Sequence, residues 1–427
     1  MEDNGSRKSK NKILINMSQN EDNLLLKDLK VIDAGSFIAG PVSTTILSDF
    51  GAKVIKIEPP KSGDSLRHLM ERTKRVNPYS KENYSWHLTS RNKQSLALDL
   101  NSQEGQEILK DLVKESDVFV TNMPKRIRDK LKINAMDLLP LNDRLIYGSL
   151  TGYGEEGPDS HRTAFDTMAW WARSGLMDIV RPSDNSLPAN PPIGMGDQPT
   201  GVALYASIMT ALYRREKTGK GGEVHTSLMA NGAWSNGSMI QAGLFGADFP
   251  DRKEPFPLHP FGGRFETKDG RFLLLAIIDA AKEWPKFLKV MNLEYLNKDE
   301  RFSSFKNLNS NFRELYKKLE KEFLKFTLDE ISDKLRPSEV TFGVLSKSTD
   351  HAKDKQFLEN EILVKFDETS FASETLTVNS PVFLKGERKR LPKRGPAIGE
   401  HSKEILFNLG KTAEEIEELK QKGIIDF

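Results

Sequence analysis

One aspartate stands in a sequence context that could support nucleophilic chemistry. Asp197 follows Gly194-Met195-Gly196 and precedes a segment with helical spacing that begins at Thr200. An Asp at a helix N-terminus faces free N–H groups and the positive end of the helix dipole, which favour its ionised form. An accessible carboxylate can attack an activated carbonyl and form a covalent intermediate. The same pattern is also typical of a simple helix cap, so both interpretations stay open at this point.

Two glycines raise the alternative of a dinucleotide site. Gly35 and Gly40 lie between an expected strand and an expected helix, where dinucleotide folds use glycines to admit a pyrophosphate. Glu58, at the end of the next expected strand, could bind a ribose. Phe37, however, stands where the second glycine of that motif belongs. An ordinary βα turn of a parallel sheet is therefore the simpler interpretation.

Two other segments leave a choice between packing and binding. The stretch from Ala164 to Gly175 contains Trp170 and Trp171, which we expect to pack in a core or interface, with contact to an acyl group as the alternative. Neighbouring residues of an α-helix point to different sides, so at least one indole should face a cavity, a neighbour or a partner. A basic segment is expected to be a solvated loop, with phosphate binding as the alternative; its members are Lys385, Arg388, Lys389, Arg390, Lys393 and Arg394.

Composition excludes several kinds of chemistry. The 427 residues include no Cys, which rules out disulfides, thiolate catalysis and Cys-based metal sites, and the seven His are too scattered for a local metal motif. Lys and Arg number 63 against 61 Asp and Glu, a balance that does not indicate a nucleic-acid-binding protein. No apolar run approaches a transmembrane helix, and the polar N-terminus does not read as a signal peptide. We expect a cytoplasmic protein with no metal, no nucleic-acid partner and no membrane partner.

The elements that must position these residues alternate between strand and helix, which predicts a parallel sheet. Strands are expected at residues 29–33, 53–58, 95–100, 117–121 and 144–150, and helices at 42–50, 102–116, 165–175 and 200–217. Beyond residue 240 the pattern changes to a hairpin at 264–278, a helix at 312–335 and a helical return at 405–425.

The expected fold class is α/β, with a Rossmann-like large domain built on a parallel sheet and a smaller α+β domain. Residues 1–26 are expected to form a flexible N-terminal extension and 27–240 the large domain. Residues 241–370 would form the small domain, and 371–427 would return to the large one.

From about Lys27 to the C-terminus the sequence resembles the family III CoA-transferases of the CaiB/BaiF type, which include formyl-CoA and carnitine CoA-transferases and a racemase branch. The matching segments occur in one order along the chain: residues 29–33, 39–41, 51–60, 63–64, 92–95, 98–100, 117–118 with Asn122, 151–154, 196–197, 218–221 and 399–401. Each segment alone is weak, and their shared order makes the resemblance specific.

The resemblance implies an acyl-CoA:carboxylate CoA-transferase in which Asp197 is the nucleophile and passes through anhydride and aspartyl-CoA thioester intermediates. The substrates would be an acyl-CoA and a carboxylic acid, with no tightly bound cofactor, and two chains would form an interlocked homodimer. CoA would lie along the sheet edge of the large domain, with Lys130 and Arg162 beside its phosphates. The implied CoA contacts are Ile38, Ala39, Leu98, Asn101, Asn122, Met123, Lys130, Arg162 and Phe165.

Some positions depart from the family pattern. Formyl-CoA enzymes carry Gln where Ile38 stands, and their run of four glycines has no counterpart at residues 253–263. The racemase branch has Gly-His-Asp where this chain has Ala164-Phe165-Asp166, which argues against exchange of an α-proton between two bases. The alternatives are an acyl-CoA racemase or isomerase and a non-catalytic CoA-binding protein, with an NAD-dependent oxidoreductase least favoured. The sequence does not identify the two acids.

Overall fold

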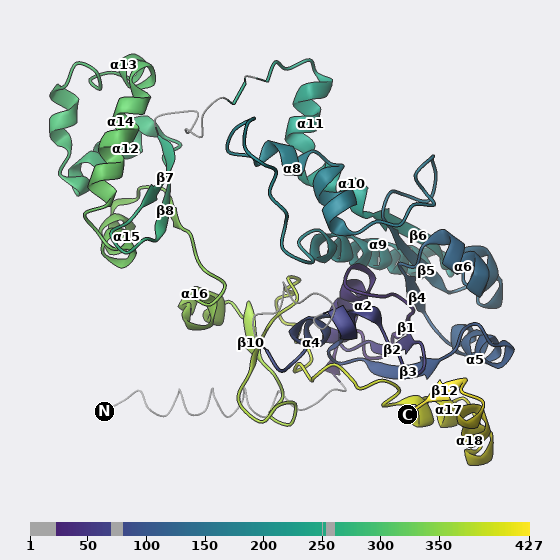
Figure 1. Ribbon diagram of the computed structural model, residues 1–427. Helices are drawn as coiled ribbons and strands as arrows, with labels where there is room; N and C mark the ends of the chain where they lie inside the picture. Colours follow the sequence, from purple (N-terminus) through teal and green to yellow (C-terminus); the bar gives the residue numbers. More distant parts are fainter. Residues whose placement is uncertain (1–22, 70–79, 250, 253–260) are drawn as a thin grey trace, which may run out of the picture. The chain divides into compact units, whose positions relative to one another are not determined.

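The computed structural model describes residues 23–69, 80–249, 251–252 and 261–427, which form two compact units (Figure 1). The larger unit comprises Met1–Val180, Pro188–Asp248 and Lys355–Phe427, and the smaller comprises Arg181–Leu187 and Phe249–Asp354. These limits differ from the expected small domain at 241–370, because residues 241–248 and 355–370 group with the larger unit and residues 181–187 with the smaller one. Most of the expected extension, residues 1–22, lies outside the described residues.

A seven-stranded mixed sheet is the framework of the larger unit. Its strands lie in the order β12-β3-β2-β1-β4-β5-β6, and only β12 runs antiparallel to its neighbour. The order of the six parallel strands is that of a doubly wound Rossmann-type sheet, so the expected α/β class is confirmed. The strands are β1 (Lys30–Asp33), β2 (Lys53–Glu58), β3 (Gln94–Leu98), β4 (Val118–Thr121), β5 (Ile146–Thr151), β6 (Gly222–Ser227) and β12 (Ile425–Asp426).

Helices cover both faces of this sheet. On one face α2 and α9 pack on Val31, Val118 and Val120, and on the other face α5 packs on Ile32 and Phe119. The alternation follows from the two-residue period of a strand. The helices of the larger unit are α2 (Ala39–Asp49), α4 (Tyr84–Ser90), α5 (Gln103–Lys114), α6 (Lys125–Leu131), α7 (Ala135–Leu138), α8 (Leu176–Ile179), α9 (Asp197–Thr218), α10 (Leu228–Ser235), α11 (Gly237–Leu244), α16 (Lys355–Glu359), α17 (Ser402–Asn408) and α18 (Ala413–Gln421).

Local signals account for several helix ends. Ser102 caps α5 as expected, since its hydroxyl accepts a hydrogen bond of 3.0 Å from the N–H of Gly105. Helix α9 ends at Gly219, whose φ of +74° is the left-handed conformation that glycine adopts without strain. Helix α9 begins earlier than the expected Thr200, however, and so includes Asp197 in its first turn.

The smaller unit packs helices against a three-stranded antiparallel sheet. Strands β7 (Gly262–Glu266) and β8 (Phe272–Ala276) form the expected hairpin, and β9 (Phe342–Val344) pairs with β8. The expected single helix at 312–335 is wrong, because it divides into α14 (Phe312–Phe323) and α15 (Leu328–Leu335). Thr327 and Glu330 form a reciprocal capping box that starts the second helix. The remaining helices are α12 (Ala280–Met291) and α13 (Phe305–Ser310).

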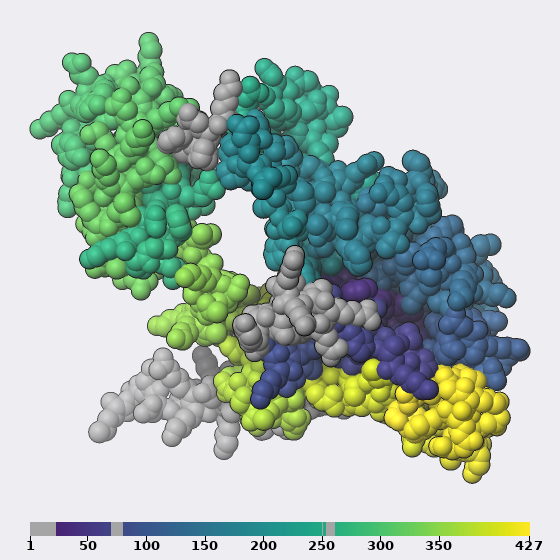
Figure 2. All heavy atoms as spheres, in the orientation of Figure 1, coloured from purple at the N-terminus to yellow at the C-terminus, as the bar shows by residue number. Residues whose placement is uncertain are grey.

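The C-terminal segment is held on the larger unit by polar contacts. Arg390 donates a hydrogen bond of 3.0 Å to the carbonyl of Gly51, and Arg394 pairs with Glu400 at 3.0 Å. Arg390 therefore tethers the basic segment to the larger unit, and the expectation of a solvated loop is wrong for this residue, whereas Arg394 is exposed and pairs within the C-terminal segment. The expected helical return consists of α17, α18 and β12, which adds a strand beside β3; Figure 2 shows this segment in yellow. Strands β10 (Leu363–Lys365) and β11 (Leu376–Val378) form a small hairpin.

Within the described part of the chain, every helix is too short or too polar to cross a lipid bilayer.

Candidate active site

Asp197 is the first residue of α9, with Gly196 in the N-cap position. The aspartate is partly exposed, and its carboxylate makes no hydrogen bond or ion pair with the described residues. Asp197 is therefore not the cap of α9, and the interpretation of a simple capping aspartate is wrong. A carboxylate that leaves its helix uncapped is free to serve another purpose.

The turn before Asp197 is fixed from several sides. The N–H of Gly196 donates a hydrogen bond of 3.1 Å to Asp166 Oδ2, and its carbonyl accepts one of 2.7 Å from the Thr200 hydroxyl. A Cβ atom at Gly196 would lie 2.6 Å from the Trp170 ring, so only glycine fits. Gly194 has a φ of +79°, and a Cβ there would lie 3.2 Å from Ile38. These contacts give the nucleophile candidate a defined position.

The electrostatic setting of Asp197 differs from the expectation. Burial raises the pKa of Asp197 to about 7, with a further contribution from the negative charge of Asp166. The helix dipole favours the ionised form by only about 0.3–1 kcal/mol. It cannot offset a change that corresponds to roughly 4 kcal/mol. Asp197 is thus a partly protonated acid near neutral pH, and its carboxylate is more basic than an ordinary aspartate.

The aromatic segment forms a π-helix, η4 (Thr167–Ala172), where an α-helix was expected. Trp170 and Trp171 are each 6% exposed, and their rings stack with centroids 5.8 Å apart. Of the expected surroundings of the two indoles (a cavity, a neighbour or a partner), the structure shows a neighbour, because both belong to the core beneath α9. The packing interpretation is confirmed, and it places Trp170 directly behind Gly196.

The loop after β1 is clasped by two polar side chains. The N–H of Phe37 donates to Asp64 Oδ1 at 3.0 Å, and the N–H of Ser36 donates to Asn122 Oδ1 at 2.7 Å. These bonds hold Phe37 at a φ of +60°, a conformation that a bulky residue rarely adopts. Its ring lies edge-on to that of Phe165 at 5.8 Å. The loop therefore brings the start of α2 toward the turn that carries Asp197.

Buried ion pairs support this loop from below. Lys56 Nζ lies 2.9 Å from Asp64, and Lys93 Nζ lies 2.9 Å from Asp33; all four side chains are almost fully buried. Lys56 also donates a hydrogen bond to the carbonyl of Gly35. The sequence analysis missed this network. The signal was a charged residue inside a parallel strand that is buried on both faces, as Lys56 is in β2.

The expected CoA contacts gather mainly where the parallel strands end. Ile38 and Ala39 start α2 and are 5% and 3% exposed, and Asn122 and Met123 directly follow β4. Asn122 also binds the Ser36 backbone, so it serves the loop itself. Phe165 is 51% exposed and lies against Phe37. These residues form one group beside the start of α9.

The other expected contacts are more scattered. Leu98 is 1% exposed inside the hydrophobic core, and its side chain is enclosed there. Asn101 and Lys130 are exposed, and the Gln106 amide links their neighbourhoods by donating to the carbonyls of Leu100 and Leu131 at 2.7 Å. Arg162 is exposed and pairs with Asp159 at 3.0 Å.

The dinucleotide interpretation is wrong for this structure. Glu58 is 2% exposed, and its carboxylate binds Arg67 at 2.7 Å and the Ser95 hydroxyl at 2.6 Å. No oxygen of Glu58 is left to face a ribose. The space beside Gly35 and Gly40 is occupied by the Asn122 side chain. The racemase alternative also loses support, because Phe165 supplies no acid or base where that branch has His.

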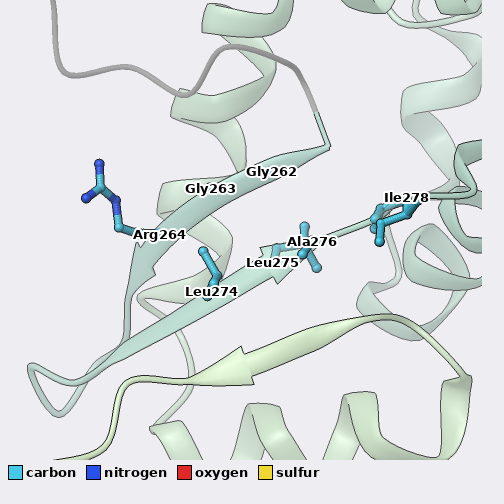
Figure 3. A pocket seen from close by; sticks show the side chains of 8 residues that line it. Gly262, Gly263, Arg264, Leu274, Leu275, Ala276 and Ile278 are labelled. Carbon is cyan, nitrogen blue, oxygen red and sulfur yellow. The ribbon is translucent and has the colours of Figure 1, made fainter. Parts of the chain in front are cut away.

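The smaller unit has a separate hollow of about 340 Å³ along β7 and β8 (Figure 3). It is lined by Gly262, Gly263, Arg264, Leu274, Leu275, Ala276, Ile277 and Ile278. It includes none of the expected site residues and no carboxylate. Most of the segment compared with the four-glycine run, residues 253–260, lies outside the described residues.

Comparison with known proteins assigns the family. The sequence model of CoA-transferase family III matches residues 26–402. The chain is 34% identical over 404 residues to (R)-2-hydroxy-4-methylpentanoate CoA-transferase of Clostridioides difficile, covering 95% of this chain and all of the relative. It is 32% identical to cinnamoyl-CoA:phenyllactate CoA-transferase of Clostridium sporogenes, covering 94% and 97% of the two chains. A CaiB/BaiF family protein from Brucella suis has a similar structure, with a TM-score of 0.78 at 27% identity, over 91% of this chain and all of that one.

These matches extend over nearly the whole chain and agree with the doubly wound sheet. The chain belongs to CoA-transferase family III, and it is an enzyme that transfers CoA.

Proposed function

We propose that the enzyme moves CoA from a donor acyl-CoA to an acceptor carboxylic acid through covalent intermediates on Asp197. The Asp197 carboxylate attacks the donor carbonyl, the C–S bond breaks, and CoA leaves as its thiolate. The thiolate then attacks the Asp197 carbonyl carbon of the mixed anhydride. This step expels the donor acid as a carboxylate and leaves an aspartyl-CoA thioester.

The acceptor completes the exchange by the same two steps in reverse. Its carboxylate attacks the aspartyl thioester and expels the CoA thiolate, which gives a second anhydride. The thiolate attacks the acceptor's acyl carbon, the new acyl-CoA forms, and the Asp197 carboxylate is regenerated. No proton is gained or lost over the cycle, and the thioester energy passes from one acid to the other.

One observation carries this proposal: Asp197 is held by a rigid turn yet has no hydrogen bond or cation from the described residues. A carboxylate stabilised by a cation would be a weak nucleophile. The raised pKa of Asp197 instead supports a basic and reactive carboxylate.

CoA is proposed to lie across the carboxyl ends of the parallel strands, as in other doubly wound folds. The start of α2 at Ile38 and Ala39 would contact the thioester end, because Ile38 reaches Gly194 in the turn before the nucleophile. Lys130 and Arg162 are exposed cations on this unit and would bind the phosphates.

The acids are proposed to be 2-hydroxy acids with a branched or aromatic side chain. Two relatives are named for such acids, (R)-2-hydroxy-4-methylpentanoate and phenyllactate. The apolar Ile38 beside Gly194 supports an apolar acyl group over formate or oxalate. A panel of CoA donors and acceptors, followed by chromatography of the thioesters, tests this class; preferred transfer to small dicarboxylates would contradict it.

Trapping tests the nucleophile directly. The enzyme is incubated with a donor acyl-CoA and then with hydroxylamine, and peptides are mapped by mass spectrometry. We expect a hydroxamate at Asp197 in the wild type and neither hydroxamate nor activity in Asp197→Ala. Asp143→Asn is the matched control, since Asp143 is an exposed aspartate of the same unit. A wild type that turns over without a modified Asp197 would exclude the mechanism.

A homodimer is also proposed. Trp234, Leu244 and Phe245 are 86%, 76% and 84% exposed at α10 and α11, which is unusual for large apolar side chains unless another surface covers them. Light scattering on the purified enzyme should give twice the chain mass, and Leu244→Asp should shift the protein toward the monomer. A monomeric wild type would refute the dimer.

A further inference from the structure

We propose that Asp166 is a positioning residue for CoA transfer: its buried carboxylate orients the peptide before Asp197 and sets a negative charge beside the nucleophile. The inference rests on the proposed role of Asp197. The sequence analysis named this aspartate within the aromatic segment and in the comparison with the racemase branch, and gave it no role in this chain.

The geometry of Asp166 ties two functional segments together. Asp166 is only 6% exposed, and each of its carboxylate oxygens accepts one backbone hydrogen bond. Oδ1 accepts from Thr167 N at 2.8 Å, which caps the π-helix, and Oδ2 accepts from Gly196 N at 3.1 Å. The second bond fixes the plane of the Met195–Gly196 peptide, which is one peptide unit before the bond that leads into Asp197.

The two hydrogen bonds explain why a carboxylate stands here, since an asparagine or a serine could accept from only one of the two amides. They do not neutralise its charge, and burying a charge without a cation is costly. No Lys or Arg in the described ranges forms an ion pair with Asp166, unlike Asp33 or Asp64 nearby. The charge is therefore left to act on its surroundings, and the neighbouring titratable group is Asp197.

The charge acts on the covalent steps in one direction. Asp197 is negative as a free carboxylate but neutral as an anhydride or a thioester. Repulsion from Asp166 thus raises the free energy of the free carboxylate and leaves the acylated forms unaffected. Among the described residues, the side chains nearest to the glycines of this turn and of the first turn of α9 are apolar: Ile38 and Val42 of α2, and Trp170 of η4. Asp166 is the charged group that acts on Asp197.

The test compares Asp166→Asn and Asp166→Glu with the wild type and Asp143→Asn. Asn keeps the size and one acceptor oxygen but removes the charge. We expect the acidic limb of kcat/KM against pH to move to lower pH by about one unit, with kcat about tenfold lower and KM for acyl-CoA within about twofold. Asp166→Glu should restore the position of the limb and part of kcat.

Two outcomes would overturn the inference. One is a lower kcat in Asp166→Asn with the acidic limb unmoved, which would leave only a structural role. The other is a rise in KM with kcat unchanged, which would assign Asp166 to substrate binding. If Asp166→Asn does not fold, as judged by circular dichroism, the position of the acidic limb of kcat/KM is measured in Asp166→Ser instead, and the same outcomes apply.

Trapping at Asp197 separates this inference from the proposed function. A wild type without a hydroxamate at Asp197 refutes the nucleophile itself. A wild type that is trapped normally, together with an unshifted limb in the charge-free variants, refutes only the role of Asp166.

Discussion

Replacing Asp197 with asparagine should stabilise the protein, and it should do so more at pH 8 than at pH 5. Asp197 has an ordinary value of 3.8 in the unfolded chain, and its folded-state pKa is raised to about 7. Between these values the folded protein holds a proton that the unfolded chain has lost. Stability therefore falls as pH rises from about 4 to 7 and stays low above that range. An asparagine side chain does not ionise, so the variant does not lose this stability as the pH rises.

The size of the effect follows from the two pKa values of Asp197. The raised pKa lowers the free energy of unfolding by roughly 4 kcal/mol at pH 8 and roughly 1.5 kcal/mol at pH 5, a difference of about 2.5 kcal/mol. The dipole of α9 favours the charge by about 0.3–1 kcal/mol and reduces the difference. We therefore expect Asp197→Asn to gain about 1.5–2 kcal/mol more over the wild type at pH 8 than at pH 5.

Urea titrations at both pH values measure this difference without any substrate. The quantity compared is the change in unfolding free energy, mutant minus wild type, at pH 8 and at pH 5. Asp143→Asn, which replaces an exposed aspartate, should give nearly the same change at both pH values. If Asp197→Asn is no more stabilising at pH 8 than at pH 5, the carboxylate is not held in the desolvated setting described above, and the reasoning fails.

Three further predictions follow from the same contacts. The rate constant kcat/KM should rise about tenfold per pH unit below pH 7 and level off above it, because the proposed nucleophile is the ionised Asp197 carboxylate; a flat profile from pH 5 to 8 would contradict this. Gly196→Ala should lower both kcat and the melting temperature, since its Cβ would lie 2.6 Å from the Trp170 ring, at a cost of about 1–3 kcal/mol; unchanged kcat would show that the turn is not critical. Lys93→Met should destabilise the protein by about 1.5–3 kcal/mol, because it removes the cation 2.9 Å from Asp33 and leaves that carboxylate only Lys56 at 3.9 Å, and adding Asp33→Asn should recover part of the loss in urea titrations; additive losses would argue against a coupled pair.

The fold could be predicted where the signal is local and periodic. Strand β2 at Lys53–Glu58 and the cap of α5 at Ser102 agree with the sequence patterns, because alternation and capping are set by neighbouring residues. The break at Thr327 was missed, although its capping box is visible in the sequence, because the apolar spacing continues across it. The pairing of β12 with β3 joins residues far apart in the chain, and no local pattern reports such a contact.

The candidate site likewise has features that the sequence predicts and features that it does not. The glycines around Asp197 mark a turn before a helix, so the nucleophile could be proposed from sequence. Its ionisation could not, since burial and the approach of Asp166 arise only when η4 packs against α9. The helix dipole favours the ionised form of Asp197, as expected. Burial and the charge of Asp166 act in the opposite direction, and together they change the pKa of Asp197 by more.

The pairing of buried carboxylates with cations in the larger unit supports the proposed acylation of Asp197. The carboxylates near the β1 loop are each given a cation: Asp33 has Lys93, Asp64 has Lys56, Glu58 has Arg67 and Asp49 has Arg91. Among the described residues, Asp166 and Asp197 have none. A nearby cation lowers a carboxylate pKa by about 1–3 units, and each unit stabilises the free carboxylate by about 1.4 kcal/mol. In the proposed mechanism, attack on the donor acyl-CoA begins from that free carboxylate, so a cation would raise the barrier to this step. The enzyme pairs its structural carboxylates with cations and leaves Asp197 without one. The free energy of the free Asp197 carboxylate therefore stays close to that of its anhydride and thioester.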